Sequence, residues 1–318
     1  MKKRFIGLLS LAIAPILVAS LASCGNSNKI KIGVCQLVTH DALDAATQGF
    51  IDAVEKGLGK NNVDIDVQIA AGDPATCATI ANTFVSKKKA LIMANATPAL
   101  QAAAASTTTI PILGTSITDY ATALSLENFD GTIGGNISGT SDLAPLTEQV
   151  AVLREVFPSA QKVGLLYCSA EANSIYQINI VKAALEAEGV ETMNLSFSDS
   201  NDIAAVLNTA VGKVDVIYVP TDNTAASNTE IIDSICRPAG LPVVAGEENV
   251  CKTCGTVTLS IDYYAIGKKT GEMAVEILKN NADISKMPVA FDTNPVKKYN
   301  PTICTELGIT VPSTFVAC

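Results

Sequence analysis

Six short polar segments, each following an apolar run, carry side chains that could contact a ligand. They are Gln36 to Asp41, Asn95 to Thr97, Thr115 to Asp119, Ser169 to Ser174, Pro220 to Asn223 and Gly246 to Asn249. In an open parallel sheet, ligands bind beyond the carboxyl ends of the strands. If the apolar runs are parallel strands, these segments form the site of a small molecule.

The sequence lacks the residue patterns of common catalytic centres. His40 is the only histidine, and no Gly-x-Ser-x-Gly turn is present. Gly131 to Gly139 has neither the Walker pattern nor the dinucleotide-binding spacing, so we interpret it as a hinge or turn. We therefore expect no enzymatic activity and no cofactor. We expect His40 to stack on or hydrogen-bond a ligand, with a solvated side chain as the alternative.

The cysteine spacing does not favour a metal site. Cys251 and Cys254 form a lone CxxC pair without a second pair or a nearby histidine, whereas zinc needs four ligands. We expect either a loop disulfide or two unpaired thiols there, and no metal. Cys35 and Cys168 lie in or at the end of strand-like runs, which predicts buried free thiols.

Apolar runs and Ala-rich helical stretches alternate from Lys29 onward, which predicts βαβ units and parallel sheets. The strands of the first set are predicted near Ile30 to Gln36, Val63 to Ala70, Ala90 to Ala94 and Ile110 to Gly114. Its helices are predicted near Leu43 to Lys56, Pro74 to Ser86 and Pro98 to Ser106. Asp73 and Thr97 each precede a proline, as an N-cap residue does.

A second set of the same kind follows the glycine-rich segment. Its strands are predicted near Lys162 to Tyr167, Glu191 to Phe197, Val214 to Val219 and Leu241 to Ala245, and its helices near Leu146 to Val156, Ser174 to Glu188, Ile203 to Val211 and Thr229 to Cys236. A strand near Gly255 to Ile261 and a helix near Tyr263 to Leu278 come after it. We predict two Rossmann-like lobes joined by a hinge: residues 30–138 plus 256–285, and 139–255 plus 286–318.

The N-terminus has the pattern of a secretory signal. A cationic start, Met1 to Arg4, precedes an uncharged run to Ser23, so we interpret residues 1–23 as a signal peptide. A membrane span is the alternative, but Pro15 interrupts the run and no cationic cluster follows directly. Removing the three cations of this segment changes the net charge from −9 to −12. Such an acidic chain argues against nucleic acid as a partner.

The residues before Cys24 resemble a bacterial lipobox, Leu21-Ala22-Ser23-Cys24. That resemblance implies a diacylated Cys24 as the first residue of the mature protein, followed by a polar tether over residues 24–29. Two acyl chains anchor a protein stably to a membrane. An ordinary secretory cleavage, which would leave Cys24 an odd thiol, is the alternative.

Five motifs in order resemble one family. They are Thr39-His40-Asp41-Ala42-Leu43-Asp44, Gly135-Asn136-Ile137-Ser138-Gly139-Thr140-Ser141-Asp142, Leu166-Tyr167-Cys168-Ser169-Ala170-Glu171-Ala172-Asn173-Ser174, Val219-Pro220-Thr221-Asp222-Asn223 and Ser260-Ile261-Asp262-Tyr263-Tyr264-Ala265-Ile266-Gly267. They are similar to motifs of ABC transporter substrate-binding lipoproteins, whose better-known branch binds tryptophan and other aromatic amino acids. Asp41 and Tyr120 stand where that family commonly has proline.

The resemblance implies the type I periplasmic binding fold and an extracytoplasmic, lipid-anchored solute receptor of an ABC importer. An ABC permease and an amino acid, with aromatic ones favoured, are the expected partners. A sensory receptor for a nucleoside or sugar, reporting to a membrane signalling partner, is the alternative from a different class. Fold alone does not decide between them.

An α-amino acid would need donors for its carboxylate and acceptors for its ammonium group. Arg154 and Arg237, the arginines beyond Arg4, are predicted on or just after helices and away from the polar segments. Backbone N–H groups at a helix N-terminus are thus expected to hold the carboxylate, and Asp222 with Glu247 to hold the ammonium. The other predicted contacts are Gln36, Asn95, Thr97, Ser116, Asn173, Ser174 and, for stacking, Tyr176. The alternative for Thr97, Asn173 and Asp222 is a plain cap or turn role.

Overall fold

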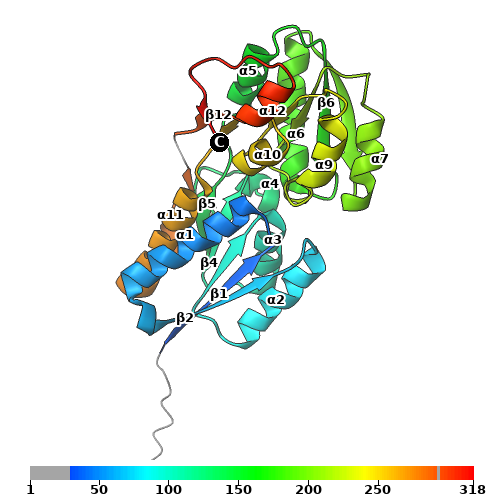
Figure 1. Cartoon of the computed structure of the whole chain (residues 1–318). Coiled ribbons are helices and arrows are strands. Elements are labelled where there is room, and N and C mark those ends of the chain that lie inside the picture. The colour runs from blue at the N-terminus through cyan, green and yellow to red at the C-terminus, as the bar shows by residue number, and fades with distance from the viewer. Residues whose placement is uncertain (1–28, 292–293) are drawn as a thin grey trace, which may run out of the picture.

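The computed structural model describes residues 29–291 and 294–318, which form two α/β lobes stacked end to end (Figure 1). The predicted signal peptide, Cys24 and the tether up to residue 28 lie outside the described residues. Within the described part of the chain, no helix is both long and apolar enough to span a membrane.

Lobe 1 is built on a six-stranded parallel sheet in the order β11-β5-β4-β3-β1-β2. Its strands are β1 (Ile30–Gln36), β2 (Val63–Ile69), β3 (Leu91–Asn95), β4 (Ile112–Ile117), β5 (Ile137–Ser141) and β11 (Ala290–Phe291). Its helices are α1 (Asp41–Leu58), α2 (Pro74–Ser86), α3 (Thr97–Ser106), α4 (Tyr120–Leu124) and α11 (Tyr263–Asn280), with short 3-10 turns at Lys60–Asn62 and Ile284–Lys286.

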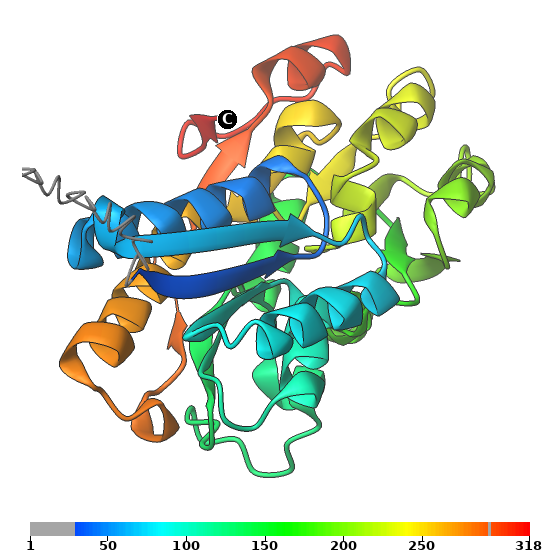
Figure 2. The same ribbon diagram turned by 90° about the horizontal axis from the view of Figure 1, so that it is seen from below.

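Apolar residues on both faces of this sheet explain its two helical layers. Ile32 and Val34 pack with Phe50 of α1 and Met273 of α11. Cys35, which points to the other face, packs with residues of α2 and α3. Figure 2 shows the two layers with the sheet between them. A parallel sheet covered on both faces needs such nearly continuous apolar strands.

Lobe 2 contains a seven-stranded sheet in the order β13-β12-β10-β9-β8-β6-β7, in which only the β10–β12 pair is antiparallel. Its strands are β6 (Lys162–Cys168), β7 (Glu191–Phe197), β8 (Val216–Val219), β9 (Val243–Ala245), β10 (Val257–Ser260), β12 (Val296–Tyr299) and β13 (Val316–Ala317). Its helices are α5 (Leu146–Val156), α6 (Ala172–Ala187), α7 (Ile203–Asn208), α8 (Asn223–Ala226), α9 (Thr229–Cys236), α10 (Glu248–Thr253) and α12 (Pro301–Glu306), with a 3-10 turn at Ser200–Asp202.

The chain passes between the lobes at different residues from those predicted. The crossings were predicted near residues 138, 255 and 285, and each observed crossing comes later in the chain. The reason is that β5 and β11 belong to the lobe 1 sheet, whereas β10 belongs to the lobe 2 sheet. The segment predicted as a bare hinge therefore ends in a strand. The small polar residues of β5 and the shortness of β11 hide both strands from a hydropathy pattern.

The two predicted proline-linked caps have different outcomes. Asp73 caps α2 and accepts from the N–H groups of Ala75 and Thr76, as predicted. Thr97 is not a cap, because α3 already includes it and Ala96 precedes the helix with φ of 89°. The N–H of Ala96 still donates to Thr115 O, so the sheet pairing extends to Ala96 and the turn occurs there.

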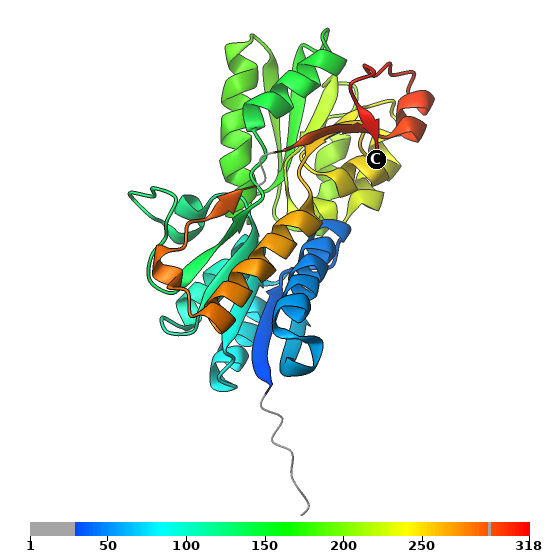
Figure 3. The same cartoon turned by 90° about the vertical axis from the view of Figure 1, so that its left-hand side faces the viewer.

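Helices α1 and α11 run side by side at very short range (Figures 1 and 3). Glycines permit this approach: a Cβ atom at Gly267 would lie 1.9 Å from Ala46 O, and one at Gly49 would lie 2.2 Å from Tyr264 O. This pairing fixes α11 against the first helix of lobe 1. The chain enters α11 directly after it crosses from lobe 2.

Replacing Gly267 with alanine should destabilise the protein. Overpacking costs about 1–3 kcal/mol, which exceeds the gain of up to roughly 1 kcal/mol from alanine's better helix propensity. Urea denaturation of Gly267→Ala should show a lower free energy of unfolding, while Lys269→Ala on the exposed face of the same helix should be nearly neutral. A Gly267→Ala protein as stable as the wild type would contradict this close packing.

Candidate ligand-binding site

A small, narrow cavity lies where the two lobes meet. Lobe 1 contributes His40, Leu43, Ser116, Thr118, Asp142 and Tyr263, and lobe 2 contributes Asn173, Thr221, Asp222, Asn223, Ala226 and Glu247. Five predicted contacts line it: His40, Ser116, Asn173, Asp222 and Glu247.

A distortion of β4 places Ser116 in the cavity wall. The pairing of β4 with β5 shifts register between Gly114 and Ile117, and Ser116 has a left-handed φ of 55°. A bulge of this kind re-aims a side chain. The Ser116 side chain is buried, and its hydroxyl has no hydrogen-bond partner among the described residues.

Asp142 follows the carboxyl end of β5 and is the strongest site residue that the sequence analysis missed. Its Oδ2 accepts a hydrogen bond from the Tyr263 hydroxyl at 2.9 Å, whereas its buried Oδ1 has no partner in the described structure. Burial raises the pKa of Asp142 to about 6, and hydrogen bonds with the Tyr263 and Thr118 hydroxyls oppose the shift. The rule that found the other loops would have found Asp142 had β5 been recognised as a strand.

His40 reaches across the junction between the lobes. It precedes α1, and its Nε2 lies 3.4 Å from Asn223 Oδ1 in lobe 2. Burial lowers the pKa of His40, opposed chiefly by the hydrogen bond to Asn223. The neutral ring with its proton on Nε2 leaves Nδ1 as an acceptor, and this buried atom has no partner within the described residues.

Asn173 presents its side-chain oxygen to the same cavity. Its Nδ2 donates to Glu171 Oε2 and to Thr221 O, both at 3.1 Å. These two acceptors fix the orientation of the amide group, so Oδ1 is left buried and unpartnered in the described structure.

Asp222 and Glu247 each line the cavity and also cap a helix, two roles that were predicted as alternatives for Asp222. Each caps a short helix, Asp222 by accepting from Ala225 N and Glu247 by accepting from Val250 N, both at 2.8 Å. Burial raises the pKa of each carboxyl to about 7, and for Asp222 the nearby Glu171 raises it further. A cap at a cleft can therefore also face a ligand.

Glu171 organises the lobe 2 side of the site and was not singled out from the sequence. Its two buried carboxylate oxygens accept hydrogen bonds from both the backbone and side chains of Asn223 and Thr224, at 2.6–3.1 Å. They also accept the bond from Asn173. Glu171 therefore holds the start of α8 and Asn223, the residue that meets His40.

The other predicted contacts lie behind the cavity wall. Gln36 and Asn95 both bond to Thr47 of α1, at 2.6 and 3.0 Å, and thus hold α1 on the sheet. Thr97 and Ser174 are buried near the starts of α3 and α6, where the hydroxyl of Ser174 bonds Asp222. Tyr176 packs against the lobe 2 core. None of the five is among the residues that line the cavity.

The cavity is acidic and offers mainly acceptors. Asp142, Asp222 and Glu247 line it together, and no lysine or arginine does. Its unpartnered polar atoms, within the described chain, are three acceptors and one hydroxyl: His40 Nδ1, Asp142 Oδ1, Asn173 Oδ1 and Ser116 Oγ. Residues 29–291 and 294–318 contain no group of three or more side chains able to hold a metal ion. The site is therefore suited to a ligand that brings its own hydrogen-bond donors.

Two relatives are similar to this chain in sequence. The chain is 36% identical over 300 residues to a tyrosine-binding protein of Clostridioides difficile (strain R20291), covering 89% of this chain and 86% of the relative. It also resembles an uncharacterised protein of Rickettsia prowazekii (strain Madrid E), at 21% identity over 84% of this chain and 81% of the relative.

Solved structures place the two lobes in a known fold. The ABC domain from Streptococcus pneumoniae in complex with L-Trp matches with a TM-score of 0.85 and 32% identity, over 90% of this chain and 97% of that one. The ligand-free, open structure of a substrate-binding protein with adhesive properties from Clostridium difficile matches with a TM-score of 0.69 and 38% identity, over 91% and 98%. The fold is the predicted type I periplasmic binding fold, which a leucine-binding protein of Thermotoga maritima shares at 13% identity over 87% of both chains, with a TM-score of 0.63.

The family model described as ABC transporter substrate binding protein matches residues 31–317. Its members bind solutes and are not enzymes, which confirms the prediction of a non-enzymatic receptor. The chain belongs to the family of ABC transporter substrate-binding proteins.

Proposed function

We propose that this protein is the extracytoplasmic, lipid-anchored receptor of an ABC importer for an amino acid, with an aromatic one favoured. The observation that carries the ligand class is the set of unpartnered acceptors on the cavity wall: His40 Nδ1, Asp142 Oδ1 and Asn173 Oδ1. Buried polar atoms without partners are costly. An ammonium group has three N–H donors and a positive charge, and thus complements all three.

Asp142 is the proposed counter-ion of that ammonium group. Asp222 and Glu247 were expected to fill this role. In each of them, however, both carboxylate oxygens already accept a hydrogen bond from a backbone N–H. Asp142 alone among the three has an oxygen without a partner in the described residues. Asp222 and Glu247 then contribute negative potential rather than direct bonds.

The ligand carboxylate would be held by neutral donors. No basic side chain lines the cavity, and Arg154 and Arg237 bond to residues elsewhere in lobe 2. The hydroxyls of Ser116, Thr118 and Thr221 lie on the wall, where those of Thr118 and Thr221 are 3.5 Å apart. This proposal differs from the expectation of backbone N–H groups at a helix N-terminus, and of the three hydroxyls only that of Ser116 belongs to a predicted contact.

An aromatic ligand is favoured by the relatives, and the departures from the family motifs lie outside the cavity wall. One relative is named for tyrosine and another structure holds L-Trp. Neither Asp41 nor Tyr120, the residues that replace the usual prolines, lines the cavity; Tyr120 is buried in lobe 1, where its hydroxyl donates to Thr140 O at 3.1 Å.

The lobes adopt an arrangement suited to a bound ligand. Two polar contacts span the junction, His40 with Asn223 at 3.4 Å and Thr118 with Thr221 at 3.5 Å. The chain superimposes better on the L-Trp complex than on the open structure, although it is more similar in sequence to the latter. A hinged receptor closes in this way around its ligand, and the closed form would dock on the permease.

Replacing Asp142 with asparagine should weaken amino-acid binding. A hydrogen bond to a charged group contributes about 1.5–3 kcal/mol, so the Kd should rise by roughly ten- to one-hundred-fold. Calorimetric titration of tyrosine, tryptophan and phenylalanine into Asp142→Asn and wild-type protein measures this, with Asp64→Asn on exposed β2 as the matched control. An unchanged Kd in Asp142→Asn would remove Asp142 from the site, and binding of a sugar or nucleoside alone would overturn the ligand class.

Affinity should also depend on pH. A bound ammonium group favours the ionised form of Asp142, so the binding energy is present above the pKa of about 6 in the free protein and is lost as the pH falls below it. Protonation of Asp222, Glu247 and His40 acts in the same direction. Titrations from pH 7.5 to 5 should show Kd rising at acid pH, less steeply in Asp142→Asn than in Asp64→Asn. A Kd that falls at acid pH would contradict the proposed ammonium site.

The proposed anchor makes a separate prediction. If Cys24 is diacylated, it holds the protein on the outer face of the membrane, and Cys24→Ser should release it into the soluble fraction. Fractionation and immunoblotting of cells expressing each form measures the distribution, with Cys318→Ser as a control that keeps the lipobox. A Cys24→Ser protein that stays with the membrane to the same extent would rule out lipid anchoring at this residue.

A further inference from the structure

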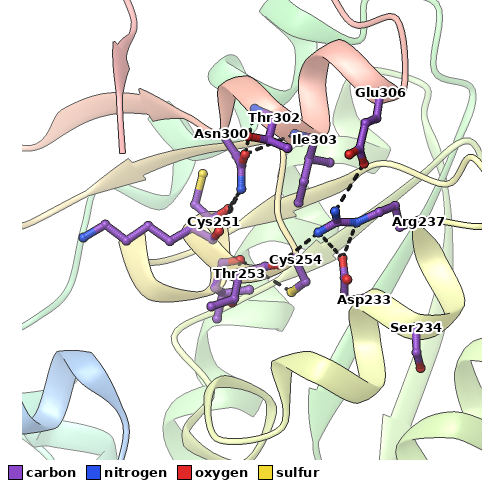
Figure 4. A network of polar contacts seen from close by, with 12 residues as sticks. Asp233, Ser234, Arg237, Cys251, Thr253, Cys254, Asn300, Thr302, Ile303 and Glu306 are labelled. Atoms are coloured by element: carbon purple, nitrogen blue, oxygen red, sulfur yellow. Dashed lines mark hydrogen bonds and ion pairs between the residues drawn. The ribbon is translucent and has the colours of Figure 1, made fainter.

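The segment that follows residue 294 packs against helix α10, at the side of lobe 2 near the lobe junction (Figure 1). Figure 4 shows Asn300 bridging the two: its Nδ2 donates to Cys251 O and Lys252 O of α10, at 3.1 and 2.8 Å, while its Oδ1 caps α12. Lys298 of β12 forms an ion pair with Glu248, the first residue of α10. This segment therefore supports the helix that Glu247 begins.

Two thiols meet at the same contact. The Sγ atoms of Cys251 and Cys318 lie 3.3 Å apart. Cys251 is fully buried in α10, and Cys318 is partly exposed just after β13. The backbone N–H of Cys318 donates to Tyr299 O at 3.0 Å, which holds the residue at the end of the sheet.

We propose that Cys251 and Cys318 form a disulfide that fastens the segment after residue 294 to α10. Their sulfur atoms need to approach by little more than 1 Å to reach a bond of about 2.05 Å. The bond would link residues 67 apart in sequence, so it would constrain the unfolded chain over a long loop.

The bond forms by exchange with a small-molecule or protein disulfide. The Cys318 thiolate attacks one sulfur of that disulfide and releases the first thiolate, giving a mixed disulfide on Cys318. The Cys251 thiol then loses its proton and displaces the second thiolate, so the oxidant leaves as two thiols and the protein gains one S–S bond. Exposure suits Cys318 for the first step, and the Cys251 thiol lowers the pKa of Cys318 by hydrogen-bonding its sulfur.

Other cysteines near Cys251 are less suited to pair with it. Cys254, the CxxC partner, directs its Sγ to Val250 O at 3.5 Å, within its own helix. Cys304 directs its Sγ to Thr256 O at 3.4 Å. Both are buried, so an incoming disulfide reaches Cys318 more easily than either. Cys251 thus pairs with Cys318, and not with Cys254 in the loop disulfide that was one predicted outcome for the CxxC pair.

Peptide mapping of the full chain tests the proposal independently of any ligand. The purified protein is incubated with oxidised glutathione, alkylated, and digested with trypsin and a glutamate-specific protease. Trypsin cuts after Lys252 and the second protease after Glu248 and Glu306, so Cys251, Cys254, Cys304 and Cys318 fall on separate peptides. The expected product is a Cys251–Cys318 cross-linked peptide, and the intact mass before alkylation should be lower by two hydrogen atoms.

Variants and melting temperatures complete the test. The cross-link should persist in Cys304→Ser and disappear in Cys318→Ser. Oxidation should raise the Tm of the wild type and of Cys304→Ser by several degrees, but it should not raise the Tm of Cys318→Ser. Dithiothreitol should reverse the rise. A Cys251–Cys254 or Cys304–Cys318 peptide, glutathione adducts alone, or an equal Tm shift in Cys318→Ser would overturn the proposal. None of these outcomes depends on what the cavity binds.

Discussion

The burial of carboxyl groups at the junction of the lobes is the constraint on which the site depends. Asp142, Asp222, Glu171 and Glu247 are each at most 5% exposed, and moving a charged group out of water is expensive unless partners replace the water. Backbone N–H groups supply most of those partners here. Where they are missing, at one oxygen of Asp142, the protein leaves a position that a cationic ligand group can fill.

The elements around the junction serve to hold these groups in place. Glu171 fixes the start of α8, and the bonds of Gln36 and Asn95 to Thr47 fix α1. The close contact of α1 with α11 then positions Tyr263, whose hydroxyl orients Asp142. Each step is a short-range contact within one lobe, so each half of the site is held in place by its own lobe.

Much of the architecture could be predicted because its signals are local. β7, α2, α5 and α9 have the predicted bounds, since the pattern of apolar residues that predicts each of them lies within the segment itself. β5, α10 and β12 were missed or shifted because their sequences are short, polar or glycine-rich. The two strands form by sheet pairing with distant strands, which a single sequence does not display.

The site was predictable to the extent that it follows strand ends. His40, Ser116, Asn173, Asp222 and Glu247 line the cavity because each follows a parallel strand at the junction or lies in its distorted end. Asp142 was missed together with its strand. Tyr176 was chosen for its place early in α6, but an early helical position does not fix the direction of a side chain, and this one turns to the lobe 2 core.

The bulge at Ser116 has a consequence for how such receptors change their ligand during evolution. Few residue types tolerate a left-handed backbone, so this part of the wall accepts few substitutions. Leu43 and Ala226 lie on helices in the opposite walls, where residues of other sizes are tolerated by the backbone. New specificities would therefore arise by enlarging or filling the cavity at these two positions, while the wall that holds the polar head of the ligand is inherited unchanged.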